Sequence, residues 1–181
     1  MGVYVALLRG VNVGGNNKLP MKSLCALCEV QGCKAVQTYI QSGNIVFQAS
    51  AKVAAAFPAK LKVQIQEEFG FETTVILRTA AELRAAAENN PFPADHSHVM
   101  FLDAEPNVTD AVKLDPPCTG KEAFSLRGKD LFLYLPDGAG RSKMAAYRYD
   151  KVLRTAVSMR NWRTVQQLLA LVETTLQRSS L

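Results

Sequence analysis

The chain has 181 residues, of which 48% are apolar and 20% are charged, and its formal net charge is +5. This length and composition predict a folded globular protein of one domain or two small subdomains and exclude wholesale disorder. No apolar run approaches the roughly 18 to 20 residues of a membrane span, and the run from Val3 to Leu8 is too short for the core of a signal peptide. We therefore expect a cytoplasmic protein with no membrane partner.

The first half of the chain alternates between strand-like and helix-like patterns. The predicted elements are a strand at 3–9, a helix at 20–32, strands at 36–41 and 44–48, a helix at 52–69 and a strand at 73–77. The first strand is apolar throughout, as in a strand covered on both faces. Pro58 is expected either inside the second helix or in its first turn. The order βαββαβ favours a ferredoxin-like sandwich with helices on one face of a sheet.

The second half repeats this pattern in a looser form. The predicted elements are a helix at 80–88, a strand at 98–102, a hairpin of 124–127 with 131–135, and helices at 143–153 and 162–177. We therefore expect an α+β protein, with a ferredoxin-like subdomain at 1–79 and a second α+β subdomain at 80–181 that ends in helices. Each half holds a strand, a connection and a hairpin followed by a helix, a pattern that suggests an internal duplication.

The positive charge is concentrated near the C-terminus. Residues 141–163 hold seven basic residues and one acidic residue, Asp150. Such a patch indicates attraction to an acidic partner or ligand. The alternative is a solvated helix face.

The cysteines indicate core packing, although Cys25 and Cys28 have the C-x-x-C spacing of metal and redox sites. Both follow Met21 and Leu24 at the spacing of a buried helix stripe, where a thiol acts as a small hydrophobic group. His96 and His98 share a strand face, but the segment around them offers no third ligand beyond Asp95. We predict no metal site and no cofactor.

The segment from Leu8 to Lys18 is a glycine- and asparagine-rich loop with a cation near each end. Its spacing fits neither the Walker phosphate loop nor the dinucleotide fingerprint. What remains is a generic anion cradle of flexible backbone, amide side chains and the cations Arg9 and Lys18. In the alternative interpretation, the glycines and asparagines only supply residues with positive φ in a long connection.

The segment from Ser158 to Thr164 is the second candidate. It places Trp162 between Arg160 and Arg163 at the predicted start of the last helix, where an anion is favoured. In the alternative interpretation, Trp162 anchors the core, Asn161 caps the helix and Arg160 pairs with a carboxylate. If this segment, residues 138–143 and the first loop meet in space, they form one anion site.

Three blocks carry a resemblance to a known family, namely Leu7–Asn16, Tyr39–Phe47 and Arg160–Val165. In this order they resemble the bacterial domain-of-unknown-function family 1697. The resemblance implies two α+β subdomains, the first of ferredoxin-like topology, and implies no activity. The positions it marks are Arg9, Gly10, Asn12, Gly14, Gly15, Ser42, Gly43, Asn44, Arg160, Asn161, Trp162 and Thr164. The chain departs from the pattern at Ser158 and Met159, where the family more often has threonines.

Three functions remain open at this point. The first is binding of an anionic small molecule, such as a nucleotide, or of nucleic acid. The second is an enzyme with an anionic substrate in the same loop, in which Ser42, Asn44 or Tyr39 takes part. The third is a structural or oligomerisation domain. The candidate ligand-binding residues are Arg9, Gly10, Asn12, Gly14, Gly15, Asn16, Lys18, Ser42, Asn44, Arg160 and Asn161.

Overall fold

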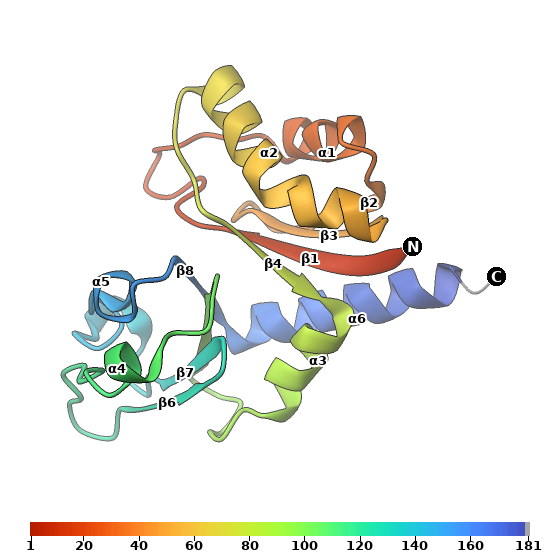
Figure 1. Cartoon of the computed structure of the whole chain (residues 1–181). Coiled ribbons are helices and arrows are strands. Elements are labelled where there is room, and N and C mark those ends of the chain that lie inside the picture. Colours follow the sequence, from red (N-terminus) through yellow and green to blue (C-terminus); the bar gives the residue numbers. More distant parts are fainter. Residues whose placement is uncertain (180–181) are drawn as a thin grey trace. The chain divides into compact units, whose positions relative to one another are not determined.

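The computed structural model describes residues 1–179 and divides into two compact units. Unit 1 comprises residues 1–85 together with the last helix from Gln166 onward, and unit 2 comprises residues 86–165. Each unit is built on a four-stranded antiparallel sheet (Figure 1). The α+β class is therefore confirmed, whereas the domain boundaries at 1–79 and 80–181 stay a prediction.

Unit 1 has the βαββαβ order of a ferredoxin-like fold, and this prediction is confirmed. Its elements are β1 (Gly2–Leu8), α1 (Met21–Val30), β2 (Lys34–Tyr39), β3 (Asn44–Ala49), α2 (Ala51–Phe69) and β4 (Val75–Thr79), followed by α3 (Ala80–Glu88). The strands lie in the order β2-β3-β1-β4. Helix α2 begins after Ser50, whose Oγ accepts from the Val53 N–H, and it continues through Pro58.

The sheet of unit 1 is buried on both faces. Successive residues of a strand point to opposite faces, and Ala6 and Leu8 join α1 and α2 in one core. Val5 and Leu7, on the opposite face, are fully buried as well. Helix α6 (Trp162–Ser179) lies on that opposite face from Gln166 onward, where Thr175 bonds to two sheet residues (Figure 1). This double cover explains why β1 is apolar throughout, as the sequence predicted.

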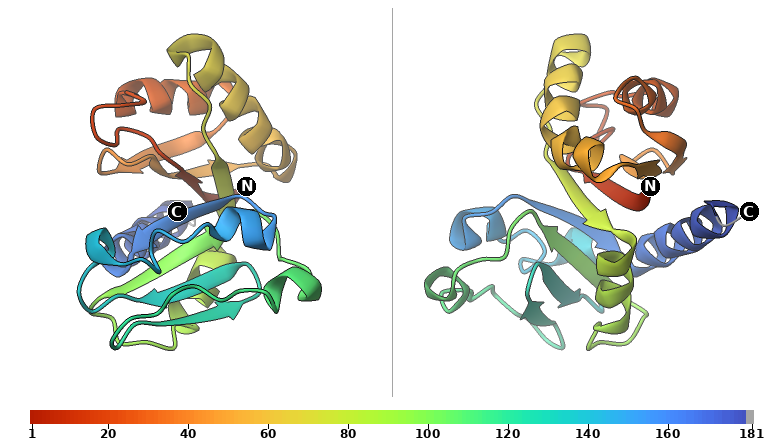
Figure 2. Two further views of the ribbon diagram at one scale, coloured as in Figure 1. Left: turned by 90° about the vertical axis from the view of Figure 1, so that its left-hand side faces the viewer. Right: turned by 45° about the vertical axis from the view of Figure 1, so that its right-hand side comes forward.

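Unit 2 has the same strand order in its own sheet, β6-β7-β5-β8 (Figure 2). Its elements are β5 (Ser97–Leu102), α4 (Val108–Ala111), β6 (Ala123–Arg127), β7 (Asp130–Tyr134), a 3-10 turn η1 (Ala139–Arg141), α5 (Tyr149–Leu153) and β8 (Val157–Asn161). One face of this sheet packs Met100, Leu131 and Leu133 against Tyr149 and Leu153 of α5. The second unit therefore repeats the βαββαβ order with much shorter helices.

Two predictions for unit 2 were wrong. The predicted helix at 143–153 is helical only over Tyr149–Leu153. The Tyr149 hydroxyl donates to the Met144 carbonyl at 2.9 Å, an acceptor that a longer helix would use for its own backbone. Strand β8 was missed because Ser158 and Arg160 are polar and break the apolar alternation that reveals a strand.

Candidate functional site

The loop between β1 and α1, residues 9–20, folds back on itself in a tight turn. The Asn16 N–H donates to the Val13 carbonyl at 3.0 Å. Between them, Gly14 and Gly15 have φ values of 57° and 80°. A two-residue turn with positive φ at both central positions strongly prefers glycine. The geometry of this turn therefore explains why glycine occupies these two predicted site positions, without any need for a ligand.

The Asn12 side chain fastens this loop to the rest of unit 1. Its Oδ1 accepts from the Leu19 N–H at 2.8 Å, and its Nδ2 donates to the carbonyls of Leu19 at 2.9 Å and Gln41 at 2.7 Å. The Asn17 Nδ2 donates to the Gly10 carbonyl at 2.9 Å. These amide groups are engaged within the protein, so their contribution to the site is to hold the loop in shape.

The turn after β2 meets the loop at the same end of the sheet. The Leu8 N–H donates to the Gly43 carbonyl at 2.9 Å. A Cβ added at Gly43 would lie 2.6 Å from the Leu8 Cβ, so glycine is required by close approach as well as by its φ of 72°. Asn44 is fully buried, and its Nδ2 donates to the Tyr39 carbonyl at 3.1 Å and the Ser42 Oγ at 2.8 Å. Asn44 therefore holds the turn and is not presented to solvent.

Arg9 is the exposed residue that directly follows β1. Its N–H donates to the Thr74 carbonyl at 3.0 Å, and its carbonyl accepts from the Thr73 hydroxyl at 2.9 Å. Beside these bonds lies a hollow of about 360 Å³, which we call the Arg9 hollow. Its lining residues are Arg9, Gly10, Asn17, Glu72, Thr73 and Thr74. The backbone of Arg9 is thus held by hydrogen bonds to Thr73 and Thr74, which form the opposite wall of the hollow.

The predicted loop residues fall into two groups, those that line the Arg9 hollow and those that do not. Arg9 and Gly10 line the Arg9 hollow, whereas Asn16 and Lys18 are exposed on the loop and are not among its lining residues. Sequence reasoning missed residues 72–74. The predicted topology could have indicated them. The first and last strands of a βαββαβ unit pair in antiparallel fashion, so the residues before β4 lie beside the end of β1.

Arg160 lies in strand β8 and not at a helix start, which corrects the predicted placement. Its side chain is buried, and its Nη1 donates to the Ser158 Oγ at 2.9 Å and the Met159 carbonyl at 2.8 Å. Burial lowers the pKa of the guanidinium to about 10, so it stays charged at neutral pH. The Asn161 Oδ1 accepts from the Thr164 N–H at 2.8 Å, which confirms the predicted cap of α6.

The candidate residues belong to different units. The loop and the turn at 42–44 lie in unit 1, and Arg160 and Asn161 lie in unit 2. The convergence of these segments on one ligand stays a prediction. The geometry described for the Arg9 hollow lies entirely within unit 1.

Two of the four cysteines occupy structural positions in unit 1. Cys28 and Cys33 are buried in the core of unit 1, joined by a 3.1 Å bond from the Cys33 N–H to the Cys28 carbonyl at the end of α1. Burial raises the pKa of the Cys33 thiol to about 11, and that of the Cys28 thiol further. Protonated buried thiols are poor metal ligands and poor nucleophiles.

Neither a metal-binding cluster nor a membrane-spanning helix occurs within residues 1–179. Within this range, no three or more His, Cys, Asp or Glu side chains gather as a metal-binding group. In the same range, no helix combines the length and apolar character needed to cross a bilayer.

Comparison with known proteins supports the family and the fold. The model of a protein family of unknown function, DUF1697, matches residues 1–132. A solved structure of the conserved bacterial protein SP0830 from Streptococcus pneumoniae is similar, with a TM-score of 0.72 and 24% identity over 94% of this chain and 98% of that one. No curated protein matches the chain. The family match covers most of the sequence, and the chain therefore belongs to the DUF1697 family of proteins of unknown function.

Proposed function

We propose that unit 1 binds an anionic ligand, a nucleotide or the phosphate of a nucleic acid, in the Arg9 hollow. The observation that carries this proposal is the exposed arginine at the rim of a hollow whose walls are hydrogen-bonded to its own backbone. A guanidinium pairs with phosphate in a fixed two-point geometry. Because the backbone of Arg9 is already held, less freedom is lost when the anion binds.

The same contacts support a structural role for the asparagines in this proposal. Asn12 and Asn17 hold the loop, and Asn44 holds the adjoining turn. This favours the structural interpretation for these residues and leaves ligand recognition to Arg9 and the hollow. An enzyme at the same loop would need Ser42, Asn44 or Tyr39 to face the ligand, but Asn44 is fully buried, and neither Ser42 nor Tyr39 is among the residues that line the Arg9 hollow. We therefore propose binding and not catalysis.

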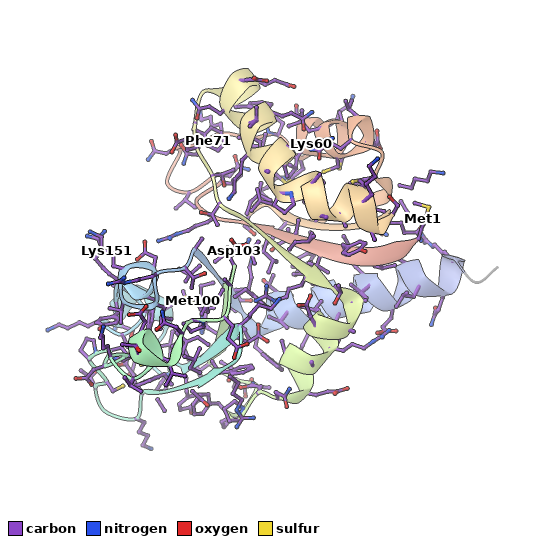
Figure 3. The ribbon with its side chains drawn as sticks, in the orientation of Figure 1. Met1, Lys60, Phe71, Met100, Asp103 and Lys151 are labelled. Atoms are coloured by element: carbon purple, nitrogen blue, oxygen red, sulfur yellow. The ribbon has the colours of Figure 1, made fainter. Side chains whose placement is uncertain are left out.

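The test is a melting-temperature screen followed by calorimetric titration. Nucleotides, phosphosugars and short RNA or DNA are added to the wild type, to Arg9→Ala and to Lys60→Ala. Lys60 is a matched cation on α2 (Figure 3), and it is not among the residues that line the Arg9 hollow. We expect a saturable shift with a phosphate-bearing ligand in the wild type and in Lys60→Ala, and at least tenfold weaker binding in Arg9→Ala.

Two further readouts decide between the ligand classes and the alternatives. Binding of a nucleic acid weakens with salt, with a log–log slope of about −0.7 to −0.9 for each phosphate contact. A compact nucleotide gives a shallow slope. If Arg9→Ala lowers the stability of the ligand-free protein by about 1 kcal/mol or more and leaves binding unchanged, Arg9 is structural and the proposal is wrong.

A further inference from the structure

A second hollow adjoins the Arg9 hollow in unit 1. It has a volume of about 520 Å³ and lies along the C-terminal half of α2, so we call it the α2 hollow. Its lining residues are Lys62, Val63, Gln66, Glu67, Glu72 and Thr73. Glu72 and Thr73 line both hollows, which therefore meet at these two residues. Volumes of about 300 to 1,000 Å³ are typical of small-molecule sites.

The two hollows differ in chemistry. The Arg9 hollow offers the Arg9 guanidinium, Thr73, Thr74, the Asn17 amide and backbone, with the Glu72 carboxylate at its border with the α2 hollow. The α2 hollow offers the side chain of Val63, which is 55% exposed, together with the flexible stems of Lys62 and Gln66. Long side chains of this type cover apolar surface with their methylene groups. The charged ends of Lys62, Glu67 and Glu72 also line the α2 hollow. One end of the combined site thus suits an anion, and the other offers apolar contact, framed by charged groups, to a larger part of the ligand.

Glu72 is one of the two residues at the junction, and its chemistry narrows the class of ligand further. An ionised carboxylate only accepts hydrogen bonds, so it selects a ligand that presents hydroxyl or amino hydrogens there. Acidic side chains bind the hydroxyl groups of ribose in this way in nucleotide sites. A second phosphate group extending toward Glu72 and Glu67 would meet two carboxylates and the single cation Lys62, so the net charge there disfavours it.

We propose that the ligand is a nucleoside monophosphate that occupies both hollows. Its phosphate pairs with Arg9, its ribose hydroxyls donate to Glu72, and its base lies against Val63 in the α2 hollow. The junction is held in place because the Thr73 hydroxyl donates to the Arg9 carbonyl, joining a residue that lines both hollows to the anion-binding residue. This inference rests on the proposed function and adds the class of ligand.

The experiment is a set of calorimetric titrations on the full chain. The ligands are the four ribonucleoside 5′-monophosphates, their 2′,3′-dideoxy counterparts, the free nucleosides and inorganic phosphate. The proteins are the wild type, Arg9→Ala, Glu72→Gln, Val63→Asp and the control Lys60→Ala. We expect at least one ribonucleoside monophosphate to bind about tenfold or more tightly than inorganic phosphate, and about tenfold more tightly than its dideoxy counterpart.

The variants separate the parts of the site. Arg9→Ala should weaken every phosphate-bearing ligand about tenfold or more, and Lys60→Ala should weaken none. Glu72→Gln should reduce the preference for ribose over dideoxyribose, because an amide oxygen is a weaker acceptor than a carboxylate, without weakening inorganic phosphate. A general loss of folding would not give this pattern. Val63→Asp should weaken the monophosphates and leave inorganic phosphate nearly unchanged. Melting temperatures within about 2 °C of the wild type confirm that the variants are folded.

Two results would overturn the inference in different ways. If inorganic phosphate binds as tightly as every monophosphate and Glu72→Gln changes no preference, the nucleoside part is wrong and the proposed anion site stands. If no phosphate-bearing ligand binds the wild type, or Arg9→Ala binds them all unchanged, both the inference and the proposed function are wrong.

Discussion

The two sheets share a strand order and two defining hydrogen bonds, yet they differ at the position where the proposed site lies. In unit 1 the Leu8 N–H donates to the Gly43 carbonyl, and in unit 2 the Leu102 N–H donates to the Lys129 carbonyl, both at 2.9 Å. The next N–H in each unit bonds to the segment before the last strand, at 3.0 Å in unit 1 and 2.9 Å in unit 2. The residue that follows the first strand of each unit thus makes the same kind of backbone hydrogen bond in both units.

That residue is Arg9 in unit 1 and Asp103, which is labelled in Figure 3, in unit 2. The loop that follows also differs, because α1 begins at Met21 whereas α4 begins at Val108, a few residues after β5. The same fold therefore carries a cation and a long, internally bonded loop in one unit, and a carboxylate and a short connection in the other. The proposed site is a property of the loop and not of the fold.

A second pair of matched residues shows what the fold itself requires. Arg78 is the last residue but one of β4, and Arg160 has the same place in β8. Both are buried, and each Nη1 donates to the carbonyl of the preceding residue, at 3.1 Å in unit 1 and 2.8 Å in unit 2. A residue that recurs at the same position in both units belongs to the common framework, which favours a structural role for Arg160.

The largest effect on stability is expected from Gly43→Ala, which disrupts the close contact between the turn at 42–44 and the end of β1. The added Cβ would lie 2.6 Å from the Leu8 Cβ, in a left-handed conformation. Clash and strain together should lower the free energy of unfolding by about 3 kcal/mol or more. The control is Gly14→Ala, which has a similar φ and no atom within 4 Å, and should cost about 1 kcal/mol. Urea unfolding followed by circular dichroism measures both, and equal losses would contradict the close-packing argument.

The next effect is expected from Asn12→Ala in the loop that unit 2 lacks. The substitution removes three hydrogen bonds that close the loop, so we expect a loss of about 2 kcal/mol. Asn16→Ala alters an exposed side chain of the same loop and should stay within about 0.5 kcal/mol. If both variants unfold at the same urea concentration, Asn12 does not hold the loop and its amide is available for a ligand.

The sequence predicted the parts of the fold that depend on apolar periodicity. Strand β1 and the hairpin of β2 and β3 could be placed because their apolar residues and the glycine turn are adjacent in the sequence. Strand β8 could not, because buried polar residues replace the apolar side chains that mark a strand. The asparagines of the loop illustrate the limit for the site. Their identity fits a ligand cradle and a hydrogen-bonded turn equally well, and only the positions of their partners decide.

The turn residues allow a stabilising prediction. Ile40 follows β2 with φ of 50°, and Gly128 follows β6 with φ of 57°. A β-branched residue is strained in this conformation, whereas asparagine tolerates it. Ile40→Asn should therefore raise the free energy of unfolding by about 1 kcal/mol, and Gly128→Ala should lower it by a similar amount. A lower melting temperature for Ile40→Asn would show that the apolar contacts of Ile40 outweigh its backbone strain.

The smallest effect concerns an ion pair in each unit and its dependence on pH. In unit 1, Arg84 donates to both oxygens of Glu173, at 2.6 and 2.9 Å, and these bonds hold the pKa of that carboxyl below its usual value of 4.5. In unit 2, the Asn107 amide, followed by Lys113 and Arg154, lowers the pKa of Asp110. A carboxyl whose folded pKa is lowered stabilises the protein above its unfolded pKa, and this stability is lost as the pH falls through the folded pKa.

The stability difference between the wild type and Arg84→Ala should thus be largest near pH 7 and shrink steadily below about pH 4.5, as Glu173 becomes protonated. Asn107→Ala should follow the same course and lose the cap of α4 at every pH. Urea midpoints measured from pH 7 to pH 3 test both variants, and NMR titration of Glu173 in Arg84→Ala should give a higher pKa than in the wild type.

The two units should differ in their response to salt. Arg84 and Glu173 are both about two-fifths exposed, so salt should weaken the effect in unit 1. The Asp110 side chain is only 5% exposed, so the effect in unit 2 should persist at high salt. A difference that stays constant across this pH range would assign both contacts to packing and not to charge.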